Sequence, residues 1–166
     1  MGLAFVCAGV QLAAQDKPDF SGSWVLESGA QVAPEIPQSM SVNQTLERTN
    51  VRGGVGTVVL QNISIKRDLE GGTRSDMYRI GLIGGAVAGL SAGIRTGTST
   101  HFRVEWAEQA LVIETGSYTG EKPESGRWSE RREVWSLEPD GRLRLAITTR
   151  SSVEDLRTVI LMYRRQ

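Results

Sequence analysis

The sequence predicts an all-β protein, an antiparallel up-and-down barrel of eight or nine strands. Apolar and polar residues alternate along several segments, most clearly over His101–Trp106, where every second residue is apolar. Turn-forming residues recur at short, even intervals, and no long segment has the periodicity of a helix. Alternation with a period of two is typical of half-buried strands, and evenly spaced strands are typical of a meander that closes on itself.

The first half of the chain contains four expected strands. They are Ser23–Glu27, Ser41–Arg48, Thr57–Lys66 and Ser75–Ile80. The first two are separated by a loop that contains Pro34 and Pro37, because proline removes a donor from the strand ladder. The second alternates in polarity, and the third is rich in β-branched residues, which favour strands. Glycine-rich turns precede the third strand and the fourth.

Gly81–Gly93 is a glycine-rich apolar segment. Its glycines superficially match a dinucleotide-binding loop, but no strand–helix–strand unit surrounds them and no ribose-binding acid follows at the usual spacing. The segment also resembles a short apolar helix with small-residue faces. We expect a flexible excursion that covers one end of the barrel or contacts a partner or a membrane surface, or else a plain linker.

The second half contains five expected strands. They are His101–Trp106, Leu111–Ile113, Glu133–Leu137, Leu143–Ile147 and Thr158–Tyr163. Residues 116–126 are expected to form a polar connection. The strongest turn is Glu-Pro-Asp-Gly at 138–141, since proline presets φ and glycine accepts a left-handed conformation.

Length and charge limit the classes of function. The chain of 166 residues fits one domain, which we place at 15–166. Nineteen basic residues balance nineteen acidic ones, so the protein has little net field to attract phosphate backbones. We therefore expect no binding to nucleic acid.

The first fourteen residues, Met1–Ala14, are apolar, small and uncharged, and they predict a secretory signal peptide at 1–14. The segment lacks the charged n-region of such signals, which leaves open a start upstream of Met1. The alternatives are a hydrophobic first strand or short helix, or lipidation of Cys7, although Phe5 and Val6 are bulkier than lipidation favours. The segment is too short to span a bilayer. We expect a secreted or periplasmic protein with no transmembrane span in the mature chain.

Phe20-Ser-Gly-Ser-Trp24 resembles the G-x-W opening of lipocalin-like barrels. The resemblance implies that Trp24 closes one end of the barrel and that an arginine near the last strand packs across its indole. Arg164 and Arg165 follow the final strand at the matching place, and cation–π attraction gives a physical reason for the contact.

More specifically, the chain resembles small exported bacterial proteins that begin D-F-S-G-x-W. These also carry a Trp-x-x-x-x-Leu-Val-Ile hairpin, an E-x-W-x-L strand and a D-G-x-L turn. The matching pieces are Asp19–Trp24, Trp106–Ile113, Glu133–Leu137 and Asp140–Leu143. The resemblance implies a lipocalin-like fold and an exported protein, without a settled activity. True lipocalins carry small apolar ligands, although a shared fold is a weak argument for a shared function.

Residues that bind metals or carry catalysis are scarce. His101 is the only histidine, and alternation places it on the face opposite Phe102, where we expect it at the surface. Cys7 is the only cysteine and lies within the expected signal. We therefore expect no metal site, no cofactor and no enzyme. A small hydrolase or isomerase that uses inward carboxylates is the least favoured function.

Glu133 is the carboxylate that needs an explanation. By alternation it shares a face with Trp135 and Leu137, and a charge on an apolar face needs a partner. Arg165, on the inward face of the last strand, is one candidate. In a functional role, Glu133 would be a polar anchor for a ligand or an acid with a raised pKa. The favoured alternatives are a structural ion pair near the barrel rim or a register bulge that turns Glu133 outward.

Aromatic residues decide between the two leading functions. Trp24, Trp106 and Trp135 are expected to fill the core. If the barrel keeps a cavity, Trp106, Glu133, Trp135 and Tyr163 are the expected ligand-binding residues. The protein would then be an exported binding module for a small apolar or amphipathic ligand. The alternative is a protein-interaction or envelope-structural domain with a filled core, which has no room for a ligand.

Overall fold

The computed structural model describes residues 17–27, 33–50, 57–81, 98–119 and 126–166. They form nine strands: β1 (Gly22–Leu26), β2 (Ser39–Asn50), β3 (Thr57–Leu69), β4 (Gly72–Gly81), β5 (Thr98–Ala107), β6 (Ala110–Thr119), β7 (Arg127–Leu137), β8 (Leu143–Ser151) and β9 (Arg157–Arg165). All ladders are antiparallel, so the predicted all-β, up-and-down barrel is confirmed. Within these ranges we find no helix of the length and apolarity that a membrane crossing requires.

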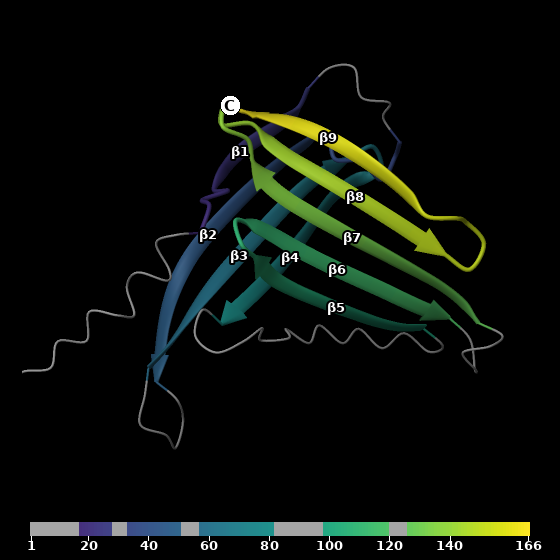
Figure 1. Cartoon of the computed structure of the whole chain (residues 1–166), viewed down its shortest axis with the longest axis horizontal. Helices are drawn as coiled ribbons and strands as arrows, with labels where there is room; N and C mark the ends of the chain where they lie inside the picture. The colour runs from purple at the N-terminus through teal and green to yellow at the C-terminus, as the bar shows by residue number, and fades with distance from the viewer. Residues whose placement is uncertain (1–16, 28–32, 51–56, 82–97, 120–125) are drawn as a thin grey trace, which may run out of the picture.

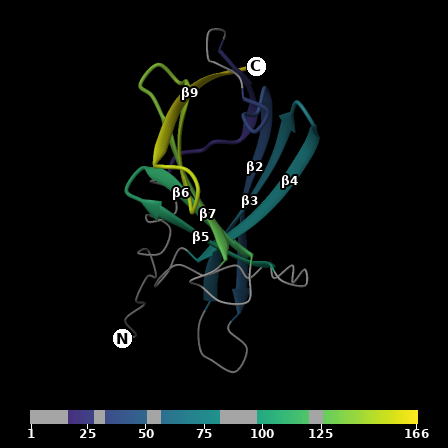
Figure 2. The same ribbon diagram turned by 90° about the vertical axis from the view of Figure 1, so that its right-hand side faces the viewer.

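Strand β1 joins the two halves of the chain. It pairs with β2 on one side and with β9 on the other, and the sheet order is β4-β3-β2-β1-β9-β8-β7-β6-β5. The single sheet curls so that β2, β3 and β4 face β5, β6 and β7 (Figures 1 and 2). The chain's first and last described strands are therefore neighbours, and the barrel is nearly closed.

The incomplete side of the barrel lies between β4 and β5, which share no ladder. Side chains bridge this seam. The rings of Tyr78 and Phe102 meet edge to face with centroids 6.0 Å apart. Nearby, the indole Nε1 of Trp106 on β5 donates a hydrogen bond to Oε1 of Gln61 on β3, at 2.7 Å. Packing and one partly buried hydrogen bond thus stand in for a ninth ladder.

Alternation along the strands places one apolar face inside the barrel. Leu143, Leu145 and Ile147 of β8 are buried, while the residues between them are half-buried. The largest fully buried side chains are Trp24, Trp135, Tyr163 and Phe20. Complete burial of one large apolar side chain contributes roughly 1.5–3 kcal/mol to the free energy of folding. These four residues therefore stabilise the barrel.

Several strands are longer than the sequence predicted. The third expected strand ended at Lys66, whereas β3 continues to Leu69, and β7 begins at Arg127. The expected strands were too short because charged residues on the inward face look like the end of an apolar strand. The expected signal Met1–Ala14 and most of the segment Gly81–Gly93 lie outside the described residues.

Candidate functional site

Trp24 lies among packed aromatic side chains at one end of the barrel, which we call the closed end. The side chain is fully buried, and its Nε1 donates a hydrogen bond of 2.8 Å to the carbonyl oxygen of Phe20. Phe20 in turn stacks on Trp106 with centroids 5.8 Å apart and contacts Trp135 edge to face. The indoles and the phenyl ring therefore form one continuous aromatic cluster, which we call the plug: Phe20, Trp24, Trp106 and Trp135.

Arg165 covers these aromatic side chains on the side that faces solvent at this end of the barrel. Its guanidinium carbon lies 4.8 Å from the ring centroid of Trp24, and its Nη2 donates to the carbonyl oxygen of Asp19 at 3.2 Å. Arg165 and Trp24 are direct partners in the β1–β9 ladder. Arg164 pairs instead with Val25 and is exposed, so only one of the two arginines contacts the indole.

Two of the four expected ligand-binding residues lie in the packed core, and a third, Trp106, packs against it. Trp135 and Tyr163 are fully buried, and the hydroxyl of Tyr163 donates to the carbonyl oxygen of Pro37 at 2.9 Å. Trp106 is half-buried within the plug. A ligand-binding role for these three stays a prediction, since none of them lines the cavities described below.

Glu133, the fourth, points into the barrel and is only 6% exposed. Its partner is not Arg165, as considered from the sequence, but Arg67 on the opposite wall. Nη2 of Arg67 lies 2.9 Å from Oε2 of Glu133. Trp135 Nε1 donates to the same oxygen at 3.0 Å, and the Arg67 guanidinium lies 5.6 Å from the Trp135 ring centroid. The carboxylate is held in a structural ion pair inside the barrel.

Three further ion pairs extend this cluster toward the other end of the barrel. Arg131 Nε donates to Oε1 of Glu133 at 2.8 Å. Arg67 also contacts Asp76 through Nη1, and Asp76 accepts from Arg74 Nε at 3.1 Å. Three arginines and two carboxylates thus form one connected network.

Pairing outweighs burial for both ions at the centre of the network. Burial alone would raise the pKa of Glu133, but the charges of Arg67 and Arg131 lower it below its ordinary value of 4.5. Burial alone would lower the pKa of Arg67, but the facing Glu133 raises it above the ordinary value. Both groups are therefore ionised at neutral pH, and Glu133 is not an acid with a raised pKa.

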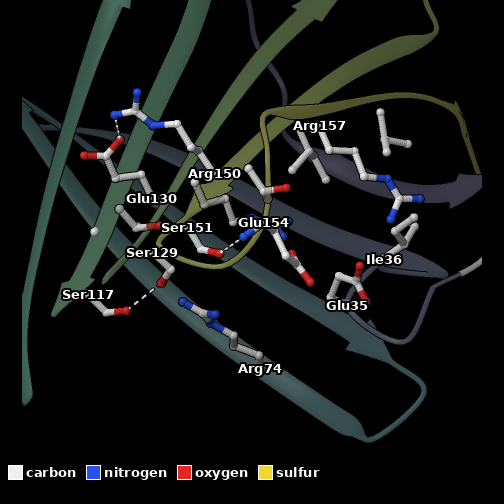
Figure 3. Close-up of a pocket in the computed structure, with 16 residues that line it drawn as sticks. Glu35, Ile36, Arg74, Ser117, Ser129, Glu130, Arg150, Ser151, Glu154 and Arg157 are labelled. Carbon is white, nitrogen blue, oxygen red and sulfur yellow. Dashed lines mark hydrogen bonds and ion pairs between the residues drawn. The ribbon is translucent and has the colours of Figure 1, made fainter. Parts of the chain in front are cut away.

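The end opposite Trp24 is hollow. A cavity of about 540 Å³, which we call the mouth, opens there among the loop that precedes β2, the β8–β9 turn and the facing strands (Figure 3). Its walls carry hydroxyl groups on three neighbouring strands: Thr115, Ser117, Ser129, Thr149 and Ser151. Ile36, Ile147 and Val159 add an apolar strip. The mouth is therefore amphipathic, with both hydrogen-bonding groups and apolar surface in its walls.

Charged residues surround the mouth. Glu130 and Arg150 pair with each other at 2.9 Å, as the dashed line in Figure 3 shows. Among the described residues, Glu35, Glu154 and Arg157 form no ion pair within 4 Å. Both signs of charge are thus available to a molecule in the mouth.

A smaller space of about 100 Å³, the inner chamber, lies between the mouth and the buried cluster. Arg67, Glu133 and Tyr78 line it, and it shares Thr115 and Arg131 with the mouth. The hollow end of the barrel therefore leads from solvent to the Arg67–Glu133 pair.

The sequence analysis did not identify the mouth residues, although one signal was present. Thr115 has the same alternation as Ile113, and Arg131 has the same alternation as Glu133, so both point inward. By sequence, the mixed charges of residues 127–133 are typical of an exposed ladder of opposite charges. That holds for Arg132, which pairs across strands with Glu114 at 3.2 Å, but not for Arg131.

No family model, curated protein or solved structure matches this chain. In the described part of the chain no group of three or more acidic, histidine or cysteine side chains is placed to hold a metal ion. The predicted exposure of His101 falls outside the described side chains. The geometry of the mouth and the inner chamber is therefore the basis for a functional assignment.

Proposed function

We propose that the protein is a binding module for a small amphipathic molecule that enters the open end of the barrel. The mouth carries the proposal: its volume of about 540 Å³ lies within the range of roughly 300–1,000 Å³ that is usual for small-molecule sites. A filled-core interaction domain, the competing function, has no need of such a space.

The lining favours an amphipathic ligand over a wholly apolar one. An apolar molecule would bury the mouth's hydroxyl and charged groups without giving them partners, which costs free energy. A ligand with an apolar segment can lie on Ile147 and Val159 while its polar groups meet Glu35, Glu154 or Arg157. The likeness to lipocalin-like barrels supports a ligand site of this kind, since Arg165 packs over Trp24 at the opposite end, as that likeness implies.

Mass spectrometry under native conditions tests the proposal. Protein purified from its own host is expected to carry a small-molecule adduct. Val159→Trp, which fills the mouth, should lose the adduct, whereas Ile160→Trp on the same strand should keep it because Ile160 is 54% exposed on the outer face. Wild-type protein without an adduct, or an adduct that V159W retains, would contradict the proposal.

We also propose that this module is exported, on the strength of the apolar segment Met1–Ala14. N-terminal sequencing of the protein from its host should begin at Gln15. A mature chain that begins at Met1 would contradict export through this segment.

A further inference from the structure

The inner wall of the mouth is built in rows that cross β6, β7 and β8. Direct ladder partners point to the same side of a sheet, so each row presents its side chains together. The row nearest the rim consists of three serines that are successive ladder partners: Ser117, Ser129 and Ser151. Figure 3 shows them in the wall of the mouth. We call these three residues the serine row.

The rows change from polar to apolar with depth. Two residues further in on each strand lies a second row of ladder partners: Thr115, Arg131 and Thr149. In the third row, Ile147 of β8 pairs with Val159 of β9, while the β7 member, Glu133, is held in the buried ion-pair network. Exposure falls in the same direction, from a half-buried Thr149 to an Ile147 that is 5% exposed. A molecule in the mouth therefore meets hydroxyl groups first and apolar surface below them.

The serine row can both donate and accept further hydrogen bonds. A hydroxyl group has one proton and two lone pairs. Ser117 and Ser129 share one hydrogen bond, with their Oγ atoms 2.7 Å apart, so the pair keeps one proton and several lone pairs. Oγ of Ser151 accepts from the backbone N–H groups of Val153 and Glu154 at 3.3 and 3.0 Å, and its proton remains. Because unpaired polar groups under a ligand cost free energy, the ligand needs donors and acceptors at several neighbouring points.

The charges of the hollow end are balanced. Four arginines and three glutamates line the mouth. Two of those arginines, Arg74 and Arg131, pair with Asp76 and Glu133. With Arg67, which contacts the same two carboxylates, the described residues of this end carry five arginines and five carboxylates. An ionic head group would lose hydration without a compensating excess of opposite charge. The balance therefore favours an uncharged head group that forms hydrogen bonds.

We propose that the mouth selects a lipid-like molecule whose head group is an uncharged sugar ring. The ring lies against the serine row and Thr149, and the apolar tail points inward to Ile147 and Val159. Neighbouring strands are about 4.8 Å apart, so the hydroxyl groups of one ring reach more than one strand. This inference rests on the proposed function and names the chemical class of its ligand.

Three probes with the same eight-carbon tail test the head group. They are octyl glucoside, the octyl ether of tetraethylene glycol, which has a single hydroxyl group, and octylphosphocholine, which is zwitterionic. NMR titration of the wild-type protein follows the backbone amides of the mouth, with each probe below its critical micelle concentration. Octyl glucoside should bind at least about tenfold more tightly than either of the others, the factor that two additional net hydrogen bonds provide.

Intermolecular NOEs test the orientation of the bound glucoside. Protons of the sugar ring should give NOEs to the β protons of Ser129, and the terminal methyl group of the tail should give NOEs to the methyl groups of Val159. The reverse pattern would mean that the head group lies at depth, and it would overturn the inference.

Two matched double variants locate the selectivity. Ser129→Ala with Thr149→Val removes two hydroxyl groups from the wall of the mouth. Ser136→Ala with Thr148→Val makes the same changes on the same strands at positions of opposite alternation, on the outer face, where Oγ1 of Thr148 lies 3.0 Å from Oγ1 of Thr158. The first variant should reduce the preference for octyl glucoside to less than about threefold, and the second should keep it. The comparison of probes on the wild-type protein stands even if a variant fails to fold.

The outcomes separate the head-group selectivity from the proposed function. Equal binding of the three probes at the mouth, or tighter binding of octylphosphocholine, would overturn the selectivity and leave the binding function in place. Failure of all three probes to bind at millimolar concentration would also overturn the selectivity. The adduct experiment on protein from its own host then decides the binding function by itself.

Discussion

Arg67 and Glu133 form an ion pair across the inside of the barrel, with Nη2 and Oε2 2.9 Å apart. They are 66 positions apart in the sequence, on strands β3 and β7 of opposite walls. Each is more than nine-tenths buried. The pair therefore ties the walls together, and each ion depends on the other for its solvation.

Neutralising Glu133 should strongly destabilise the protein. Glu133→Gln keeps the shape of the side chain but leaves Arg67 with Asp76 as its one remaining carboxylate partner among the described residues, and it removes the carboxylate that pairs with Arg131. We expect the free energy of unfolding to fall by about 3–5 kcal/mol, the usual result when one member of a buried pair is removed. Urea unfolding followed by tryptophan fluorescence measures the loss.

Glu114→Gln is the matched control on the neighbouring strand. Glu114 pairs with Arg132 at the surface, where both side chains are about half exposed. Such a pair should contribute less than about 1 kcal/mol. Similar losses for both variants would mean that the buried pair is no more important than the exposed one.

Acid should weaken the contribution of Glu133. Its pKa in the folded protein lies below the ordinary 4.5, so the unfolded chain takes up the proton first as the pH falls. The stabilisation is complete above the unfolded pKa and is lost as the pH drops through the folded pKa. The stability difference between the wild type and E133Q should stay constant from about pH 7 to about pH 6, and shrink below about pH 5. A difference that grows in acid would refute the assigned direction of the pKa shift.

Arg165 should stabilise the closed end through its contact with Trp24. Arg165→Ala is expected to lower the free energy of unfolding by about 0.5–1 kcal/mol, as for a solvent-accessible cation–π pair. Arg164→Ala should change it by less than about 0.5 kcal/mol, because Arg164 is exposed and does not contact the indole. Urea titrations of the two variants side by side test this. The idea fails if the two substitutions have the same effect.

Gly22 should resist substitution because of its backbone conformation. Its φ is +136°, a region that residues with a Cβ rarely adopt, while the space around an added Cβ is ordinary. Gly22→Ala should therefore cost about 1–2 kcal/mol through strain. Ser23→Ala, at the exposed next position, should stay within about 0.5 kcal/mol. Thermal unfolding of both variants gives the comparison, and a tolerated G22A would argue against strain at this position.

Local alternation was sufficient to predict the strands and much of the inward face. The burial of Leu143, Leu145 and Ile147 follows from their spacing alone, and so does the inward direction of Glu133. The same rule extends to Arg67, which continues the spacing of Ile63 and Ile65. The predicted strand nevertheless ended at Lys66, one residue before Arg67.

The sequence by itself therefore determined the class of fold, a barrel of eight or nine strands, and the inward face of most of the expected strands. Only the tertiary structure decided which inward residues meet. Arg165 and Arg67 both point inward, yet Arg165 lies over Trp24 at the closed end and Arg67 faces Glu133. Alternation specifies a face, whereas the position along the barrel axis depends on the register of every intervening ladder. The mouth and the inner chamber exist only once all those registers are set.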